Sequence, residues 1–196
     1  MKATPPDSLN RHNFRGKRLF LAISLPPYVK ESLASLQEEN LRGFNWVPPE
    51  RFHLTLKYIG DFPGQLQPDL ETAIDPIAVK AFLLPVEGTG SFPSIGKAHA
   101  VWAGLGSGHP HLFQLQKKIE DTLFNIGIEP EKRVYNPHIT LARVNQAADE
   151  SVRQFLKRHQ HFGAAPFKVD SFHLIRSEVR EKRRVYVTER SWDLLA

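Results

Sequence analysis

The sequence predicts a mixed α+β fold with mainly antiparallel sheets, built as a two-lobed pseudo-repeat. Helical and strand-like patterns alternate along the chain, and several strands follow one another closely enough to form hairpins. The short pattern His-apolar-Thr-Leu occurs twice, in "FHLTL" (52–56) and in "PHITL" (137–141). The two motif histidines lie 85 positions apart, which is too long for a solenoid repeat and fits two lobes with one motif each.

In the first half of the chain, the apolar run 17–25 predicts a strand. Segment 26–42 opens with two prolines and continues with apolar residues near helical spacing, which predicts a helix. A short strand at 44–47 and a longer one at 52–60 follow, with a proline turn between them. Segment 67–82 predicts a helix that Pro76 interrupts.

In the second half, 82–92 and 99–105 predict strands joined by a glycine-bearing loop. Segment 111–127 is the clearest amphipathic helix, and Gly127 is its expected C-cap. A strand at 137–144 and a helix at 148–160 follow. The strands 167–177 and 183–192 are expected to close the fold as a hairpin around a charged turn.

The composition is that of an ordinary globular chain of 196 residues, with 41% hydrophobic and 24% charged residues. No run reaches the ~18 apolar residues that span a membrane, and the first residues lack the apolar stretch of a secretory signal. The sequence contains no cysteine, which excludes disulfides, thiolate catalysis and cysteine-based zinc sites. A cytoplasmic location is expected, because a cysteine-free chain fits a reducing compartment.

Charge and chain organisation add two expectations. The net charge of +5 and the pI of about 9.5 fit an anionic partner such as RNA as well as they fit a mildly basic surface without a specific role. Residues 1–16 are polar and without periodicity, so they are predicted to form a flexible basic tail. Residues 17–196 are predicted to form a single two-lobed domain, and a monomer is expected.

The repeated motif places imidazole and hydroxyl groups together. Because alternate side chains of a strand face opposite ways, His53 and Thr55 share one face, and so do His138 and Thr140. The apolar residues between them anchor each strand. Two such strands facing across a cleft would supply two imidazoles and two hydroxyl donors.

That set of groups suits phosphodiester chemistry without a metal. Histidine titrates near neutral pH, so one neutral imidazole can take a proton from an attacking water while the other, protonated, supplies a proton to the leaving oxygen. The threonine hydroxyls can donate to the non-bridging phosphate oxygens, where negative charge builds up.

Two other interpretations stay open at this point. A single His-x-Thr on a strand is most often an unremarkable edge or core position, although its repetition with equal spacing favours a function. Two histidines can also bind a metal, but structural zinc takes four protein ligands and catalytic zinc three. Neither motif has a carboxylate at the matching position, so no metal and no other cofactor is expected.

Five segments in order resemble the two-histidine phosphoesterases, and within them the RNA 2′,3′-cyclic phosphodiesterases, also called 2′-5′ RNA ligase-like proteins. These segments are "RLFLAISLPP", "WVPPERFHLTLKYIGDF", "GTGSFPSIGKAHAVWAGL", "NPHITLARV" and "FHLIRSEVREKRRVYVTERSWDL". The resemblance covers the chain from about Arg18 onward. The sequence departs from the family pattern at its N-terminal tail and at the turn "EVREKR". That turn is more charged than the Gly-Pro turn common at this place in the family.

The resemblance implies a V-shaped central cleft between antiparallel sheets, with helices packed outside. It implies metal-independent hydrolysis of an RNA or nucleoside 2′,3′-cyclic phosphate to a 2′-phosphomonoester. By position in the motifs, His53 would be the proton donor and His138 the proton acceptor. Thr55 and Thr140 would bind the phosphate.

Five further residues are candidate substrate contacts. Arg143 follows the second motif as an arginine usually does in the family, but strand alternation puts it on the face opposite His138, so a contact requires a bend or the end of the strand. Lys57 is in register with His53 and can neutralise phosphate, although a lysine at such a position is more often simply solvated. Phe20, Trp46 and Phe92 can stack on a base or belong to the core.

Three functions are compatible with these residues. The first is hydrolysis of cyclic phosphates on RNA ends or small nucleotides. The second is 2′-5′ ligation, the reverse direction through the same site. The third is a nucleotide-binding module without turnover, which would need cations and donors but no acid–base pair.

Overall fold

A computed structural model describes residues 16–94, 96–145 and 149–196. The tail predicted at 1–16 lies outside the described residues apart from Gly16. Three sheets make up the β structure of these residues, and all pairings between the named strands are antiparallel. The mixed α+β class with antiparallel sheets is therefore confirmed.

The first sheet has the strand order β10-β9-β1-β3. Its strands are β1 (Lys17–Ser24), β3 (His53–Phe62), β9 (Ser171–Arg180) and β10 (Arg183–Asp193). The second sheet has the order β2-β7-β6-β5 and contains β2 (Phe44–Trp46), β5 (Thr89–Phe92), β6 (Ala100–Ala103) and β7 (Ile139–Val144). Each of these two sheets thus contains one motif strand, β3 in the first and β7 in the second.

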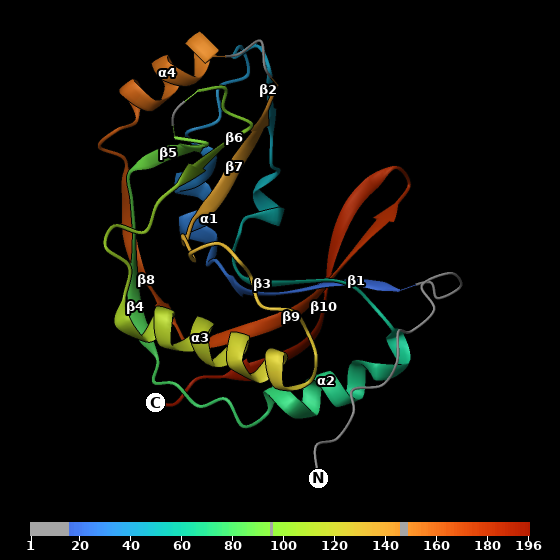
Figure 1. Ribbon diagram of the computed structural model, residues 1–196. Coiled ribbons are helices and arrows are strands. Elements are labelled where there is room, and N and C mark those ends of the chain that lie inside the picture. The colour runs from blue at the N-terminus through green and yellow to red at the C-terminus, as the bar shows by residue number, and fades with distance from the viewer. Residues whose placement is uncertain (1–15, 95, 146–148) are drawn as a thin grey trace.

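A separate pair of strands, β4 (Phe82–Glu87) and β8 (Gly163–Val169), forms the third sheet, along one side of the molecule in Figure 1. Sequence patterns did not predict this pair, because 163–166 lack the β-branched and aromatic residues typical of strands. The strand predicted at 82–92 is two strands, which separate at Gly88 with a φ of 75°. The predicted closing hairpin is present as β9 and β10.

The helices are α1 (Pro27–Ala34), α2 (Gln67–Ile74), α3 (Pro110–Asn125) and α4 (Asp149–Arg158), with short 3-10 turns at Pro49–Arg51 and Gly64–Leu66. In Figure 1, α2 and α3 lie beneath the first sheet, and α4 lies at the opposite end beside the second sheet. The helix predicted at 67–82 ends at Ile74, because Pro76 lacks the N–H that a helix needs. The helix predicted at 26–42 already ends at Ala34.

One hydrophobic core extends through both lobes and buries the apolar residues of each motif strand. Leu54 and Leu56 of β3 belong to it, as do Ile139 and Leu141 of β7. Fixing these strands by their apolar side leaves the polar side for the space between the sheets. In the described part of the chain, no helix is long and apolar enough to cross a membrane.

Candidate active site

The two motifs meet at a cavity of about 590 Å³ between the first and second sheets. Residues from β1, β3, β9 and β10 line one side, and residues from β2 and β7 line the other. Seven of the residues that the sequence singled out are among those that line it: Phe20, Trp46, His53, Thr55, His138, Thr140 and Arg143. The juxtaposition of the two motifs, which the spacing in the sequence could only suggest, is therefore present in the structure.

Each motif histidine is oriented by its own backbone. His53 Nδ1 lies 2.7 Å from the carbonyl oxygen of Arg51, and His138 Nδ1 lies 2.8 Å from that of Asn136. A carbonyl oxygen only accepts hydrogen bonds, so Nδ1 carries a proton in both rings. Nε2 is left in each ring as the nitrogen that can give or take a proton.

The surroundings lower the pKa of both imidazoles. Burial lowers the pKa of His53 below its ordinary value of 6.5, the Arg51 carbonyl partly offsets this, and the charge of His138 lowers it further. Burial also lowers the pKa of His138, in part against the Asn136 carbonyl, and Arg143 adds to the decrease. Both rings thus favour the neutral form near pH 7.

A β-bulge in each motif strand changes which side chains face the cavity. In β3, Thr55 pairs with Ala22 and Lys57 pairs with the adjacent Leu21, so one residue of β3 is extra. In β7, Thr140 pairs with Trp102 and Ala142 with Val101, which leaves one extra residue at the same place. A bulge of this kind reverses the alternation beyond it.

The bulge in β7 returns Arg143 to the cavity, so the bend that a phosphate contact requires is present. The bulge in β3 has the opposite effect on Lys57. That side chain is turned away from the cavity and buried, with Nζ 2.8 Å from a carboxylate oxygen of Glu120 and 3.0 Å from the carbonyl of Glu129. The prediction that Lys57 shares a face with His53 is wrong, and Tyr58 lines the cavity in its place.

The three predicted aromatic residues lie close to the histidines or at the cavity wall. The rings of Phe20 and His53 are 5.0 Å apart, and those of Phe92 and His138 are 4.7 Å apart. Phe92 is not among the residues that line the cavity, but it packs on a ring that does. Trp46 lines the cavity and anchors its indole N–H on the carbonyl of Glu38 at 3.1 Å.

A hydrogen bond ties the two motifs together. Tyr135, three residues before His138, donates its hydroxyl to the carbonyl oxygen of Thr55 at 3.0 Å. Burial raises the pKa of the Tyr135 phenol well above its ordinary range, so the hydroxyl remains a donor. The chain that leads into the second motif is therefore held directly against the first motif strand.

Sequence reasoning missed several cavity residues. Tyr186 packs on His53 and Tyr58 on Phe20, which adds aromatic surface, and Arg18, Arg51 and Arg184 add positive charge. One signal was available for Tyr58, because it follows His53 by five positions just as Arg143 follows His138. In the described residues, no group of three or more His, Cys, Asp and Glu is arranged to hold a metal ion.

Comparison with known proteins gives consistent matches over most of the chain. The family model described as the 2′-5′ RNA ligase superfamily matches residues 25–181. An RNA 2′,3′-cyclic phosphodiesterase of Thermus thermophilus is 32% identical over 185 residues, covering 90% of each protein. One of Methanocaldococcus jannaschii is 27% identical over 180 residues, covering 89% of this chain and 99% of the relative.

Solved structures share the fold. A protein of Thermus thermophilus superimposes with a TM-score of 0.76 at 26% identity, over 90% of this chain and 97% of its own. The LigT protein of Escherichia coli, in its apo form, superimposes with a TM-score of 0.76 at 24% identity, over 92% of this chain and 99% of its own. The fold is thus shared across most of the length of these proteins.

Proposed function

The chain belongs to the 2′-5′ RNA ligase superfamily, and from that premise we propose that it hydrolyses a ribose 2′,3′-cyclic phosphate, on an RNA end or a nucleotide, to a 2′-phosphomonoester. The relatives named RNA 2′,3′-cyclic phosphodiesterase support this reaction. The observation that carries it is the single cavity lined by both histidines and both threonines. A cytoplasmic monomer is part of the same proposal.

His138 and His53 divide the proton transfers between them. Water attacks phosphorus and loses a proton to Nε2 of neutral His138. The bond between phosphorus and the 3′ oxygen breaks, and Nε2–H of protonated His53 gives that oxygen its proton. The ring nitrogens bound to the Arg51 and Asn136 carbonyls take no part, because their protons hold the imidazoles in position.

Thr55, Thr140 and Arg143 are assigned to the phosphate. Both hydroxyls lie on the cavity side of their strands, two residues beyond the histidines, and can donate to the non-bridging oxygens. The positive charge of Arg143 acts electrostatically on His138 and lowers its pKa. Its charge favours the anionic substrate and the further charge that develops in the transition state.

Incubation with a nucleoside 2′,3′-cyclic phosphate tests the proposal, with the product isomer identified by phosphorus NMR. We expect the 2′-phosphomonoester, and His53→Ala and His138→Ala should each lower kcat by at least ~10²-fold. Both variants should remain folded, because each ring lines the cavity rather than the main hydrophobic core and its hydrogen bond is to backbone two residues away. The exposed His161 is the control, and His161→Ala should retain full activity. A folded His138→Ala protein with normal turnover would refute its assignment as the base.

A further inference from the structure

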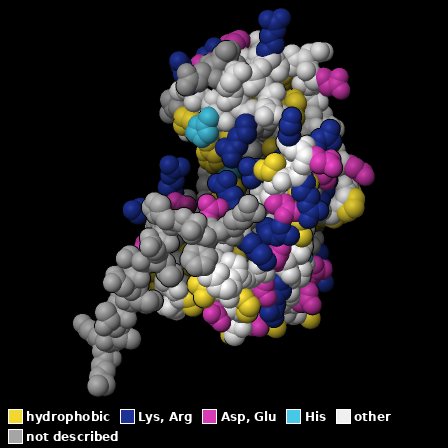
Figure 2. Space-filling model, turned by 90° about the vertical axis from the view of Figure 1, so that its right-hand side faces the viewer, with side chains coloured by type: hydrophobic (Ala, Val, Ile, Leu, Met, Phe, Trp, Pro, Cys, Tyr) yellow, Lys and Arg dark blue, Asp and Glu magenta, His cyan; other side chains and the backbone are white. Residues whose placement is uncertain are grey.

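The cavity is lined by an excess of positive charge that one cyclic phosphate does not explain. Four arginines line it, at positions 18, 51, 143 and 184, and no Asp or Glu does. Several arginines elsewhere in the described residues are paired with carboxylates, as in Arg158–Glu38 and Arg190–Asp75. None of the four cavity arginines forms an ion pair with a described carboxylate. Seen from the side of the β9–β10 hairpin, Lys and Arg side chains gather at mid-height of the molecule (Figure 2).

Two of these arginines occupy equivalent places on the first sheet. Arg18 precedes Phe20 by two residues on β1, and Arg184 precedes Tyr186 by two residues on β10. Alternation therefore puts each arginine on the same face as a ring that packs on His53, at 5.0 Å for Phe20 and 5.3 Å for Tyr186.

Ser177 lies between the two arginines. Its backbone pairs with Arg18 of β1 on one side and with Tyr186 of β10 on the other, so these three residues form one row across the sheet. Arg184 donates from Nη1 to Ser177 Oγ at 2.7 Å. That bond fixes the guanidinium over the sheet, while Arg18 and Arg184 both remain exposed. The three residues together present a hydroxyl and two guanidinium groups to the cavity.

The distance to the motif residues fits one nucleoside. Thr55 pairs with Ala22, four residues from Arg18 along β1, which is roughly 13 Å of strand. The arginine side chain spans part of this distance, and the rings of Phe20 and Tyr186 occupy the middle. In a nucleotide the ribose joins the 3′ and 5′ phosphates and the base projects to one side, so the sugar and the reach of the arginine side chains together span the distance between Thr55 and the arginines.

We propose that Arg18, Ser177 and Arg184 form a second phosphate subsite, which binds the 5′-phosphate of the nucleoside whose 2′,3′-cyclic phosphate lies between the two histidines. The inference rests on the proposed function and narrows its substrate to nucleotides that carry both phosphates. The 5′-phosphate belongs either to a mononucleotide or to the phosphodiester chain of an RNA end. A cyclic nucleoside phosphate without it is then a poor substrate.

Three substrates and three variants test the subsite. The substrates are adenosine 2′,3′-cyclic phosphate, its 5′-phosphorylated form, and a dinucleotide that ends in the cyclic phosphate. Arg18→Gln and Arg184→Gln should each lower kcat/KM about tenfold for the two 5′-linked substrates, as expected for one charge-assisted contact. The substrate without a 5′-phosphate should change less than about twofold. Arg183→Gln removes the same charge one residue away, on the opposite face of β10, and should change none of the three.

The substrates also separate the two sources of the 5′-phosphate. Equal rates on the 5′-phosphorylated nucleotide and the dinucleotide indicate that the phosphate alone is recognised, and a faster dinucleotide indicates an RNA chain. The dependence of log kcat/KM on log salt for the dinucleotide should become shallower by about one in Arg184→Gln. An equal loss on all three substrates in Arg18→Gln and Arg184→Gln would overturn the subsite.

A binding measurement keeps the subsite testable if hydrolysis is absent. Wild-type protein should bind adenosine 3′,5′-bisphosphate about tenfold more tightly than adenosine 3′-monophosphate in calorimetry. Arg184→Gln should remove that ratio and Arg183→Gln should preserve it. Lack of turnover with an intact ratio would refute the proposed function alone. Equal wild-type affinity for the two nucleotides would refute the subsite alone.

Discussion

At the scale of single residues, a backbone carbonyl two positions earlier decides which nitrogen each motif histidine offers. The Arg51 and Asn136 carbonyls accept from Nδ1, so the same tautomer is set in both lobes by local structure. Burial is the largest cause of the lowered pKa in both rings, and the nearby charges differ, since Lys30, Arg51 and His138 act on His53 whereas Arg143 acts on His138. The positive charges around His53 disfavour its protonated form, so the acid role proposed for His53 depends on the anionic substrate that binds between the two rings.

The pH dependence follows from these charges. The pKa of each ring in the free protein lies below 6.5, so kcat/KM should rise and fall around an optimum below that pH. It falls on the acid side when His138 is protonated and on the alkaline side when His53 loses its proton. An anionic substrate between the rings raises the pKa values of both imidazoles. The bell-shaped pH profile of kcat should therefore have its optimum at a higher pH than the profile of kcat/KM. Full pH profiles of both parameters check this, and coincident profiles would contradict it.

Lys57 illustrates how a single residue can be misread from sequence. Its ammonium is buried against Glu120 rather than exposed to substrate. Lys57→Met should lower the free energy of unfolding by about 3 kcal/mol, because it leaves a largely buried carboxylate without its partner. KM of the folded variant should stay unchanged. Lys117→Met is the matched control, since it breaks the exposed pair Lys117–Asp121 on α3, the helix that also carries Glu120. It should hardly alter denaturant unfolding. A rise in KM for Lys57→Met alone would restore Lys57 as a substrate contact.

At the scale of elements, the apolar periodicity of the sequence predicted the strands and helices that pack on the core, but it did not predict the bulges that arise from strand pairing. The motif strands and the amphipathic helix α3 follow from buried residues at regular spacing, such as Leu112, Leu115 and Ile119. The bulges after Thr55 and Thr140 depend on how β3 and β7 pair with neighbours distant in the sequence. For that reason the histidines and threonines could be predicted, whereas the turning of Lys57 away from the cavity could not.

The link between Tyr135 and β3 is the element-scale feature that we expect to matter for rate. Tyr135→Phe removes the bond to the Thr55 carbonyl and should lower kcat about fivefold with little change in KM, because it loosens the approach of the second motif to the first. Tyr28 makes the same type of bond at 3.0 Å to the Pro166 carbonyl, away from the cavity. Tyr28→Phe should lose similar stability, about 1 kcal/mol, and keep full kcat. Equal kcat in the two variants would show that the Tyr135 bond is only structural.

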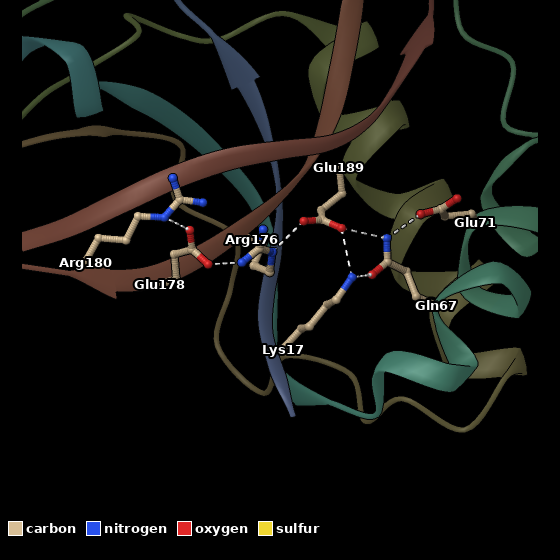
Figure 3. Close-up of polar contacts among 7 residues, drawn as sticks. All are labelled: Lys17, Gln67, Glu71, Arg176, Glu178, Arg180 and Glu189. Atoms are coloured by element: carbon tan, nitrogen blue, oxygen red, sulfur yellow. Dashed lines mark hydrogen bonds and ion pairs between the residues drawn. The ribbon is translucent and has the colours of Figure 1, made fainter. Parts of the chain in front are cut away.

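At the scale of the whole molecule, the first sheet is joined to α2 by a network of charges outside the cavity. Figure 3 shows Lys17 of β1, Arg176 of β9 and Gln67 of α2 converging on Glu189 of β10. The network spans segments that are far apart in the chain, with 172 positions between Lys17 and Glu189. It therefore fixes the base of the hairpin whose outer part carries Arg184. That residues 17–196 act as one domain stays a prediction.

Glu189 makes this network a source of pH-dependent stability. Burial alone would raise its pKa, but the hydrogen bonds from Arg176, Lys17 and Gln67 prevail and lower the pKa from 4.5 to about 2. A carboxyl whose pKa is lower in the folded state stabilises the fold fully above its unfolded pKa, and this contribution disappears as the pH falls from 4.5 towards 2. Glu189→Gln should therefore lower the free energy of unfolding at pH 7, by about 1–2 kcal/mol once solvent screening of the charges is taken into account. The difference from wild type should shrink steadily in denaturant titrations below pH 4.5.

The exposed Glu150 on α4, paired with Arg153, is the matched control for that titration. Glu150→Gln removes a carboxylate of the same type, but water screens its pair, so the free energy of unfolding should hardly change at any pH. Because Glu189 lies at the base of the hairpin, Glu189→Gln should also weaken the preference for 5′-phosphorylated substrates. The contrast between the two variants then separates the effect of the network from that of losing one surface charge. A difference between Glu189→Gln and wild type that stays constant from pH 7 to acid would contradict the role assigned to the carboxylate charge.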